Sequence, residues 1–179
     1  LDNMKNIYIL NNKKYEDKEI YVCGITNSFE YYDNEDKNIM LKDLTDNKKI
    51  ISNLPDKLKI LLIHSPVTLN DSKIKEQIKE FDYIICGHMH NGCVPPILNE
   101  IFKSTRGVIT PTKKFLKKMT RNTLKKEIDK IIVNGPITTF QKKAGVMQLF
   151  NFMYPTYISI INFDKNNQFN VKKKYHRFK

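Results

Sequence analysis

Two apolar runs decide the fold: Leu58-Lys59-Ile60-Leu61-Leu62-Ile63 and Tyr83-Ile84-Ile85-Cys86. Each is a near-continuous run of strand length, which predicts a strand buried on both faces. Between them, Asn70 and Asp71 can cap a helix whose apolar residues follow at near-helical spacing: Ile74, Ile78 and Phe81. A strand, a helix and a second strand within about 30 residues predict a βαβ unit with parallel strands. We therefore expect an α/β fold.

The segments before this unit extend the same pattern. Residues 6–10 and 19–25 have the composition of short strands, with a polar turn between them at residues 11–18. Residues 35–52 carry apolar residues on a loosely helical period. The predicted order is therefore two strands, helical turns, and then the βαβ unit.

The segments after this unit are more basic. Residues 111–133 open with Pro111 and carry apolar side chains among lysines, which predicts a basic amphipathic helix. We favour a surface helix packed on the protein's own core over docking on a membrane. A late strand is expected at residues 156–163, and the basic tail from Val171 is expected to fray.

Composition limits the class of protein. The 179 residues and 21.1 kDa suffice for one domain with a core, and the 40% hydrophobic content argues against global disorder. No run approaches the roughly 18 apolar residues of a membrane span, and no signal peptide is evident. The cysteines are Cys23, Cys86 and Cys93, an odd number without a CxxC pair. They favour a reducing compartment or buried thiols over a disulfide framework.

The net charge of +12 is unevenly distributed. Residues 1–90 carry 13 basic and 15 acidic side chains, whereas residues 91–179 carry 18 basic and 4 acidic ones. A basic half suits a nucleic acid, an anionic membrane surface or a phosphate-bearing substrate. An ordinary solvated lysine surface explains it equally well.

Three of the four histidines follow predicted strand ends. His64 comes directly after the first apolar run, and Gly87-His88-Met89-His90 follows the second. Adjacent parallel strands would bring both loops to one edge of the sheet, where sites form in open α/β sheets. Rings two residues apart in an extended loop project to opposite sides, so His88 and His90 could reach two different ions. A lone histidine at a strand end is ordinarily a hydrogen-bonded structural residue, but this combination favours metal binding. His176 lies in the basic tail and is expected to be solvated.

These residues carry a resemblance to a known family. The run Leu61-Leu62-Ile63-His64-Ser65-Pro66 with the later Phe81-Asp82-Tyr83-Ile84-Ile85-Cys86-Gly87-His88-Met89-His90-Asn91-Gly92 resembles the calcineurin-like metallophosphoesterases. More narrowly, it resembles their bacterial branch related to membrane-associated lipid phosphohydrolases. Residues 19–29, with Cys23-Gly24-Ile25-Thr26-Asn27, look like that family's strand and turn before its lone histidine, and residues 107–161 roughly follow its C-terminal part.

The resemblance implies a fold and a set of ligands. Residues 1–179 would form a single domain, the C-terminal half of a two-sheet α/β sandwich. His64 and His88 would bind one metal of a dinuclear pair, and His90 would bind the other. Gly87, Asn91 and Cys93 would lie beside the site, Cys93 standing where this branch often has glutamine. The metals would be Mn, Fe or Zn, and the reaction would be phosphoester hydrolysis by a metal-bound hydroxide attacking phosphorus.

The family's other motifs do not occur in this sequence. It has no Asp-x-His motif, no Gly-Asp motif for the bridging carboxylate and no Asn-His motif. We therefore expect that the N-terminal half of the parent domain is missing and that no catalytic residue is identifiable in this chain. Three neutral imidazoles bring no negative charge, so we expect at most one weakly held metal and little turnover from the chain alone. Its location would be cytoplasmic or membrane-associated.

Two other functions remain open. The chain could be a non-catalytic basic module that binds anionic lipid or nucleic acid through residues 113–126. Nucleic acid is the less expected partner, because arginines are few and no nucleic-acid module is recognisable. A mononuclear metal enzyme, complete as it stands, would need a carboxylate near the three histidines, and none is evident. The oligomeric state is not predicted.

Overall fold

The chain forms two compact units in the computed structural model. The first comprises residues up to Cys86 together with Lys130–Ile132, and the second comprises Gly87–Asp129 and Val133–Lys179. The structure describes residues 7–69, 71–87, 108–109, 115–116, 131–133, 157–163 and 169–175. The first unit is therefore described almost throughout.

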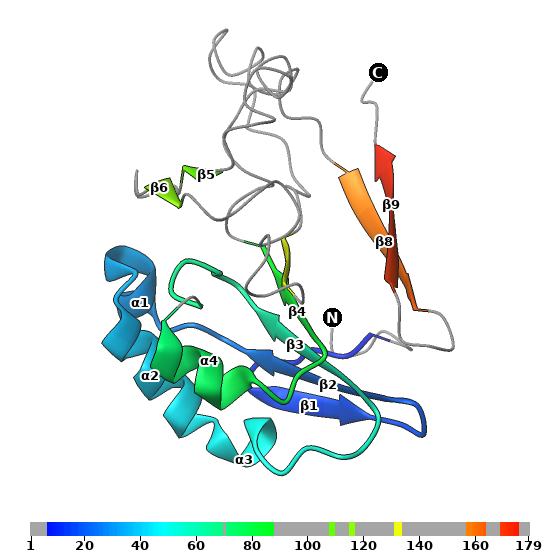
Figure 1. Ribbon diagram of the computed structural model, residues 1–179, viewed down its shortest axis with the longest axis horizontal. Helices are drawn as coiled ribbons and strands as arrows, with labels where there is room; N and C mark the ends of the chain where they lie inside the picture. The colour runs from blue at the N-terminus through cyan, green and yellow to red at the C-terminus, as the bar shows by residue number, and fades with distance from the viewer. Residues whose placement is uncertain are drawn as a thin grey trace, which may run out of the picture. The chain divides into compact units, whose positions relative to one another are not determined.

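A five-stranded mixed sheet is the centre of the first unit (Figure 1). Its strands lie in the order β1-β2-β3-β4-β7. Strand β1 is antiparallel to β2, whereas β2, β3 and β4 are parallel to one another. The strand bounds are β1 Lys13–Glu16, β2 Ile20–Ile25, β3 Leu58–Ile63, β4 Tyr83–Cys86 and β7 Ile131–Val133. The α/β fold class is thus confirmed.

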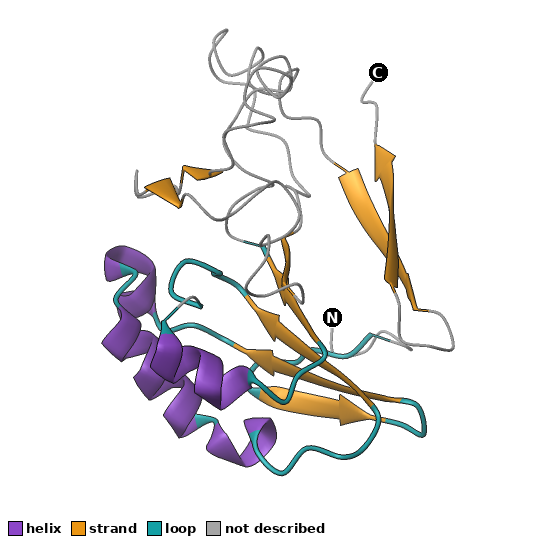
Figure 2. Cartoon of the chain, viewed as in Figure 1, coloured by secondary structure: helices purple, strands orange, loops and turns teal. Residues whose placement is uncertain are grey.

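Four helices are described, and Figure 2 shows them gathered on one side of the sheet. Helix α4 connects β3 to the parallel strand β4, which confirms the predicted βαβ unit. It begins after Asp71, whose carboxylate caps it by accepting the Lys73 N–H at 3.0 Å. The helix bounds are α1 Phe29–Asn34, α2 Lys37–Asp46, α3 Lys48–Ile51 and α4 Ser72–Ile78.

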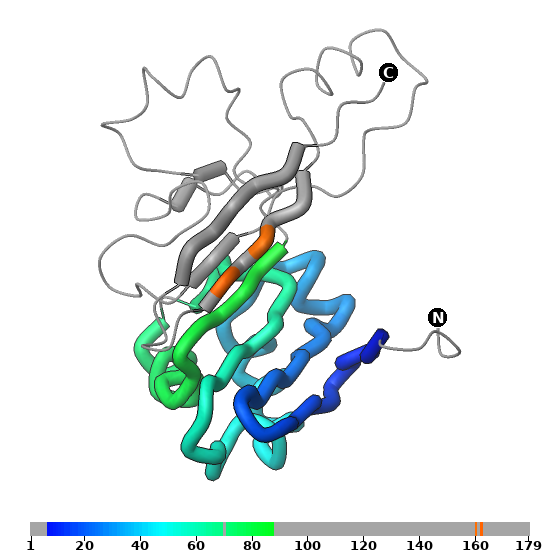
Figure 3. Tube along the Cα trace, turned by 90° about the vertical axis from the view of Figure 1, so that its right-hand side faces the viewer, coloured from blue at the N-terminus to red at the C-terminus, as the bar shows by residue number. Residues whose placement is uncertain are grey.

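The core lies between the helices and one face of the sheet. Residues paired across parallel strands share a face, so Cys23, Leu61 and Ile84 lie in one row, each at most 2% exposed. The Tyr21 hydroxyl, on the same face, donates to the Ile50 carbonyl oxygen of α3 at 2.9 Å. The helices contribute the buried side chains Tyr31, Met40, Leu44, Ile51, Ile74 and Ile78. In the turned view of Figure 3, β2, β3 and β4 again run side by side.

The other face of this sheet is also apolar. Ile60 is buried there, and Val22, Leu62 and Ile85 are half-buried. The parallel register pairs Val22 with Ile60, and Leu62 with Ile85. Because both faces are apolar, β3 reads in the sequence as a continuous apolar run rather than an alternating one.

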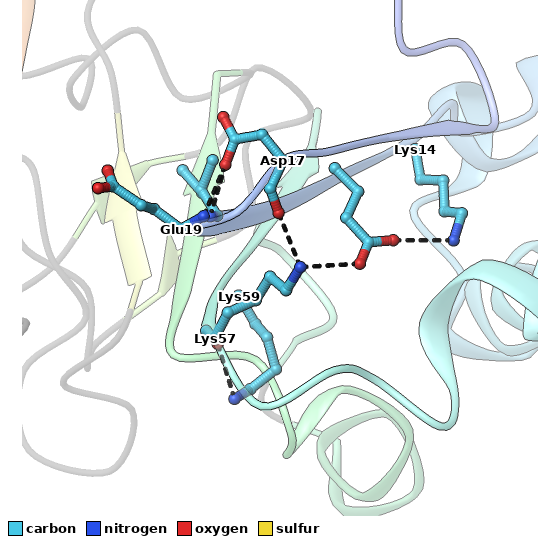
Figure 4. A network of polar contacts seen from close by, with 7 residues as sticks. Lys14, Asp17, Glu19, Lys57 and Lys59 are labelled. Atoms are coloured by element: carbon cyan, nitrogen blue, oxygen red, sulfur yellow. Dashed lines mark hydrogen bonds and ion pairs between the residues drawn. The ribbon is translucent and has the colours of Figure 1, made fainter.

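A polar network stabilises the amino ends of the parallel strands β2 and β3 (Figure 4). Glu16 pairs with Lys14 at 3.2 Å and with Lys57 at 2.9 Å, and the Lys57 ammonium also donates to the Asp17 carbonyl oxygen. The Asp17 carboxylate accepts the N–H groups of Glu19 and Ile20, both at 2.9 Å. The turn between β1 and β2 is therefore tied to the loop that enters β3.

Two predictions for the N-terminal segment are wrong. Residues 7–10 are not a strand, and the expected polar turn at 11–18 instead contains β1. Backbone pairing explains the difference, because Lys13 to Glu16 pair with Gly24 to Tyr21 as one arm of an antiparallel hairpin. A polar composition suits β1 because it lies at the end of the strand order that the structure describes.

The helix expected over residues 111–133 is also contradicted where this segment is described. Strand β6 (Phe115–Leu116) pairs with β5 (Val108–Ile109), and β7 occupies Ile131–Val133. Three successive β-branched residues in β7 favour extended backbone over helix.

The second unit contains an antiparallel hairpin of β8 (Tyr157–Phe163) and β9 (Phe169–Tyr175). The late strand predicted at 156–163 is therefore confirmed. The prediction that the chain frays from Val171 is wrong as far as Tyr175, because pairing with β8 extends from Phe169 to Tyr175. In the part of the chain that the structure describes, no helix combines the length and apolar character needed to cross a membrane.

Candidate functional site

The parallel strands of the first unit end together at one edge of the sheet. Ile25 pairs with Ile63, and Ile63 pairs with Cys86, so the last residues of β2, β3 and β4 are in register. His64 is the first residue after β3, and Gly87 is the first after β4. The expectation that the ends of β3 and β4 lie at the same edge is thereby confirmed.

His64 is half-buried and stacked on an aromatic ring. Its imidazole lies 4.8 Å from the ring centroid of Tyr32 in α1, with 30° between the ring planes. Stacking covers a face of the imidazole, whereas its two nitrogens lie in the ring plane. The stack therefore restricts the tilt of the imidazole ring. It does not cover the in-plane directions in which the nitrogens coordinate or form hydrogen bonds.

The backbone that follows His64 is anchored from two elements. The Ser65 N–H donates to the side-chain oxygen of Asn27, in the loop after β2, at 3.4 Å. The Tyr31 hydroxyl donates to the Ser65 hydroxyl at 3.4 Å and lies 3.0 Å from the hydroxyl of Thr68. Burial raises the pKa of Tyr31, which keeps this phenol protonated at neutral pH. The loop that carries His64 is thus attached both to β2 and to α1.

A buried carboxylate supports the neighbouring loop. Asp43 of α2 accepts the Ser28 N–H at 3.0 Å and the Ser28 hydroxyl at 3.3 Å. Ser28 in turn caps α1 by accepting the Tyr31 N–H at 3.3 Å. The side-chain amide of Asn27 lies 3.4 Å from the Met40 sulfur. Asp43 therefore holds the loop between β2 and α1 in place.

The two thiols of the first unit lie in its core. Cys23 and Cys86 are both free and at most 1% exposed. Burial raises the pKa of Cys23 to about 12 and also raises the pKa of Cys86. Protonated thiols are poor ligands, because metals bind the thiolate. These two cysteines serve the packing of the sheet, which agrees with the buried-thiol interpretation of the sequence.

Of the predicted site residues, His64 and Gly87 are described. His88, His90, Asn91 and Cys93 lie outside the described residues, as does His176. Among the residues that are described, no three His, Cys, Asp or Glu side chains are grouped so that they could hold a metal ion. Of the predicted metal ligands, the described residues therefore include one imidazole, that of His64.

Several residues of this edge were not predicted from the sequence. They are the supports of His64 and its loop: Ser28, Tyr31, Tyr32, Asp43 and Thr68. Only Ser28 carries a local signal, since a serine before a short amphipathic segment is a common helix cap. Tyr31 and Tyr32 contact residues far away in the sequence, so no local pattern indicates their role.

In comparisons with models of protein families, with curated proteins and with solved structures, nothing matches this chain.

Proposed function

We propose that the chain belongs to a metal-dependent phosphoester hydrolase, in which His64 and His88 bind one divalent ion and His90 binds a second. The observation that carries this proposal is the parallel register that ends at Ile63 and Cys86, each followed at once by the histidine-bearing loop. Bound divalent ions would supply Lewis acidity toward phosphoryl oxygens and lower the pKa of a water.

Covalent geometry limits how far His88 can lie from the end of β4. Two peptide units join Cys86 to His88, so their Cα atoms lie within about 7.6 Å in any conformation. Neighbouring strands lie about 4.8 Å apart, and His64 directly follows the strand partner of Cys86. The chain connection thus supports convergence of His64 and His88. Gly87 lacks a Cβ, which suits a close approach between backbone and ligands.

The donor set fits the metals named. Neutral imidazole is a common ligand of Zn and other first-row ions. The support of the His64 loop by Asn27, Ser65 and Tyr31 is the kind of surrounding structure that holds a metal ligand in place. The ligand set lacks negative charge, because all three proposed ligands are neutral imidazoles. Efficient turnover therefore requires carboxylates beyond these three histidines.

The finer fold assignment belongs to the same proposal. We propose that the first unit's sheet is one layer of a two-sheet α/β sandwich, with the chain forming the C-terminal half of the complete domain. The apolar face opposite the helices, with Ile60 buried and Val22, Leu62 and Ile85 half-buried, supports a second layer. The substrate would be a phosphoester, and the basic balance of residues 91–179 favours an anionic one.

The experiment is substitution of His88 in the full-length parent protein, followed by measurement of aryl phosphate hydrolysis and of bound Mn, Fe and Zn. We expect His88→Ala to abolish turnover and to lower the metal content, whereas His176→Ala, which removes a histidine outside the motif, should change neither. Unchanged turnover in His88→Ala would overturn its role as a ligand.

A non-catalytic basic module is the alternative. Strand β9 adds Lys172, Lys173 and Lys174 to the basic residues of the C-terminal half, on backbone that is paired rather than frayed. Binding to anionic vesicles that falls with salt but survives both chelation and loss of His88 and His90 would favour this alternative.

A further inference from the structure

Helix α1 contacts the loop after β3 through two successive residues. The Tyr31 hydroxyl reaches Ser65 and Thr68 of that loop, while the Tyr32 ring stacks on His64. One short helix thus contacts both the hydroxyl groups of the loop that carries the histidine and the histidine's ring. We infer that Tyr32 is a positioning residue that sets the plane of the His64 imidazole for cation binding. This inference rests on the proposed function of His64.

The geometry explains why a stacked ring suits this task. A histidine coordinates a cation through a nitrogen lone pair that lies in the ring plane, so the ring faces are not needed for binding. The Tyr32 ring, tilted by 30° from the imidazole at 4.8 Å, restricts rotation of the imidazole from one of those faces. The stack does not cover the in-plane directions that a coordinating nitrogen uses.

The two tyrosines of α1 contact different parts of the loop that carries His64. Asn27 and Tyr31 hold the loop at Ser65, the residue after His64. The Tyr32 stack opposes rotation of the His64 ring about its side-chain bonds. Loss of Tyr32 should therefore weaken cation binding without releasing the loop.

Helix α1 also provides a matched control. Phe29 is another aromatic residue of this helix, three positions before Tyr32, and is 92% exposed. Replacing Phe29 removes a ring from the same helix while leaving the stack of Tyr32 on His64 intact. Tyr32 itself is 40% exposed, so its replacement opens no cavity in the core.

The test is Co²⁺ titration of the full 179-residue chain and of its Tyr32→Leu, Tyr32→Phe and Phe29→Ala variants. Tyr32→Leu keeps apolar bulk and removes the ring, so we expect its Co²⁺ affinity to fall about tenfold, the scale found for residues that orient a metal ligand. Tyr32→Phe keeps the stacked ring and should retain the affinity of the original chain, and Phe29→Ala should also bind as the original chain does. Thermal unfolding of each variant shows whether the fold is retained.

A second readout separates this inference from the proposed function. The NMR signals of the His64 ring, recorded without metal, should carry a ring-current shift that Tyr32→Leu abolishes and Tyr32→Phe preserves. If the original chain binds Co²⁺ through His64 and Tyr32→Leu binds it equally well, the positioning role is overturned while the metal site stands. If the ring-current shift is present but His64 binds no Co²⁺, the proposed metal site fails, and the positioning role fails with it.

Discussion

Gly24 of β2 lies where the preceding segment crosses the sheet. A Cβ at this position would meet the Leu10 carbonyl oxygen and would lie 2.8 Å from the Leu10 Cβ. The crossing segment continues into Asn11 and Asn12, whose side chains both accept hydrogen bonds from Thr26, the first residue after β2. The absence of a Cβ at Gly24 thus allows the segment to lie close against β2 before it reaches the end of that strand.

We predict that Gly24→Ala destabilises the protein by about 1–3 kcal/mol, the usual range for overpacking. The atoms in the way are backbone and Cβ atoms of Leu10, which cannot rotate aside. Urea unfolding measures the loss. Lys13→Ala is the control, since Lys13 pairs with Gly24 from an exposed position and should change stability by less than about 0.5 kcal/mol. Equal effects of the two substitutions would contradict the close crossing.

The supports of His64 show what a sequence can and cannot indicate about single residues. His64 and Gly87 were predicted at strand ends, because the apolar runs before them are legible by themselves. Tyr32 was not predicted, because its stacking partner lies on a different element and depends on how α1 packs at the end of the sheet. Asp43 was missed for the same reason, since its bonds to Ser28 join α2 to the cap of α1.

At the scale of elements, helix α1 depends on its cap. Ser28 accepts the Tyr31 N–H and donates to Asp43, so it satisfies one helix end and one buried carboxylate together. We predict that Ser28→Ala destabilises the protein by about 1–2 kcal/mol in urea unfolding, the upper part of the range for lost caps. Ser72→Ala, at the exposed first position of α4, should have little effect. A loss no larger than that of Ser72→Ala would show that the cap contributes nothing.

Acid should loosen the turn between β1 and β2. The N–H groups of Glu19 and Ile20 hold the pKa of Asp17 below its ordinary value. A carboxyl whose folded pKa is lowered contributes stability above its unfolded pKa, near 4, and loses it as the pH falls through the folded value. We expect the urea midpoint to fall as the pH drops below about 4, and the fall to be smaller in Asp17→Asn. If the urea midpoint fell equally with pH in the original chain and in Asp17→Asn, Asp17 would make no such contribution.

Some strands could be predicted from their own residues, whereas others depend on the strand with which they pair. Strands β2, β3, β4 and β8 were predicted because each is rich in apolar residues. Strands β1 and β9 were missed because they are rich in lysine, and their extended backbone is specified by the partners β2 and β8. In β9, Lys172 and Lys174 stand opposite Ile160 and Ile158, a pairing that no reading of the tail alone reveals.

At the scale of the molecule, reactivity of the thiols reports on the first unit's core. Burial raises the pKa of Cys23 to about 12 and raises the pKa of Cys86, so neither is an accessible thiolate at pH 8. We predict that iodoacetamide leaves both unmodified in the native protein and modifies both in urea, as measured by peptide mass mapping. The raised pKa values also affect stability, because the unfolded chain loses its thiol protons at a lower pH than the folded protein does. The stability that the buried, protonated thiols contribute is therefore present below the unfolded thiol pKa and is lost as the pH rises above about 8.5. Native alkylation as fast as that in urea would contradict the buried placement.

The two halves of the chain differ in charge, and the proposed function depends on residues from both. Under the proposed function, the near-neutral first 90 residues would provide the ends of β3 and β4, and the basic remainder would attract an anionic substrate. The same positive charge would also attract anionic lipid, so binding to vesicles alone does not separate the two proposals. Metal binding by the histidines does separate them.

The most direct test is Mn²⁺ titration of the chain, followed in NMR spectra of the histidine imidazoles. A paramagnetic ion broadens the signals of the rings that bind it, and the four histidines provide their own comparison. We predict that low concentrations of Mn²⁺ broaden the signals of His64, His88 and His90 while those of His176 stay sharp. A His64 signal that remains sharp, or equal broadening of all four rings, would contradict a metal site at the end of β3 and β4.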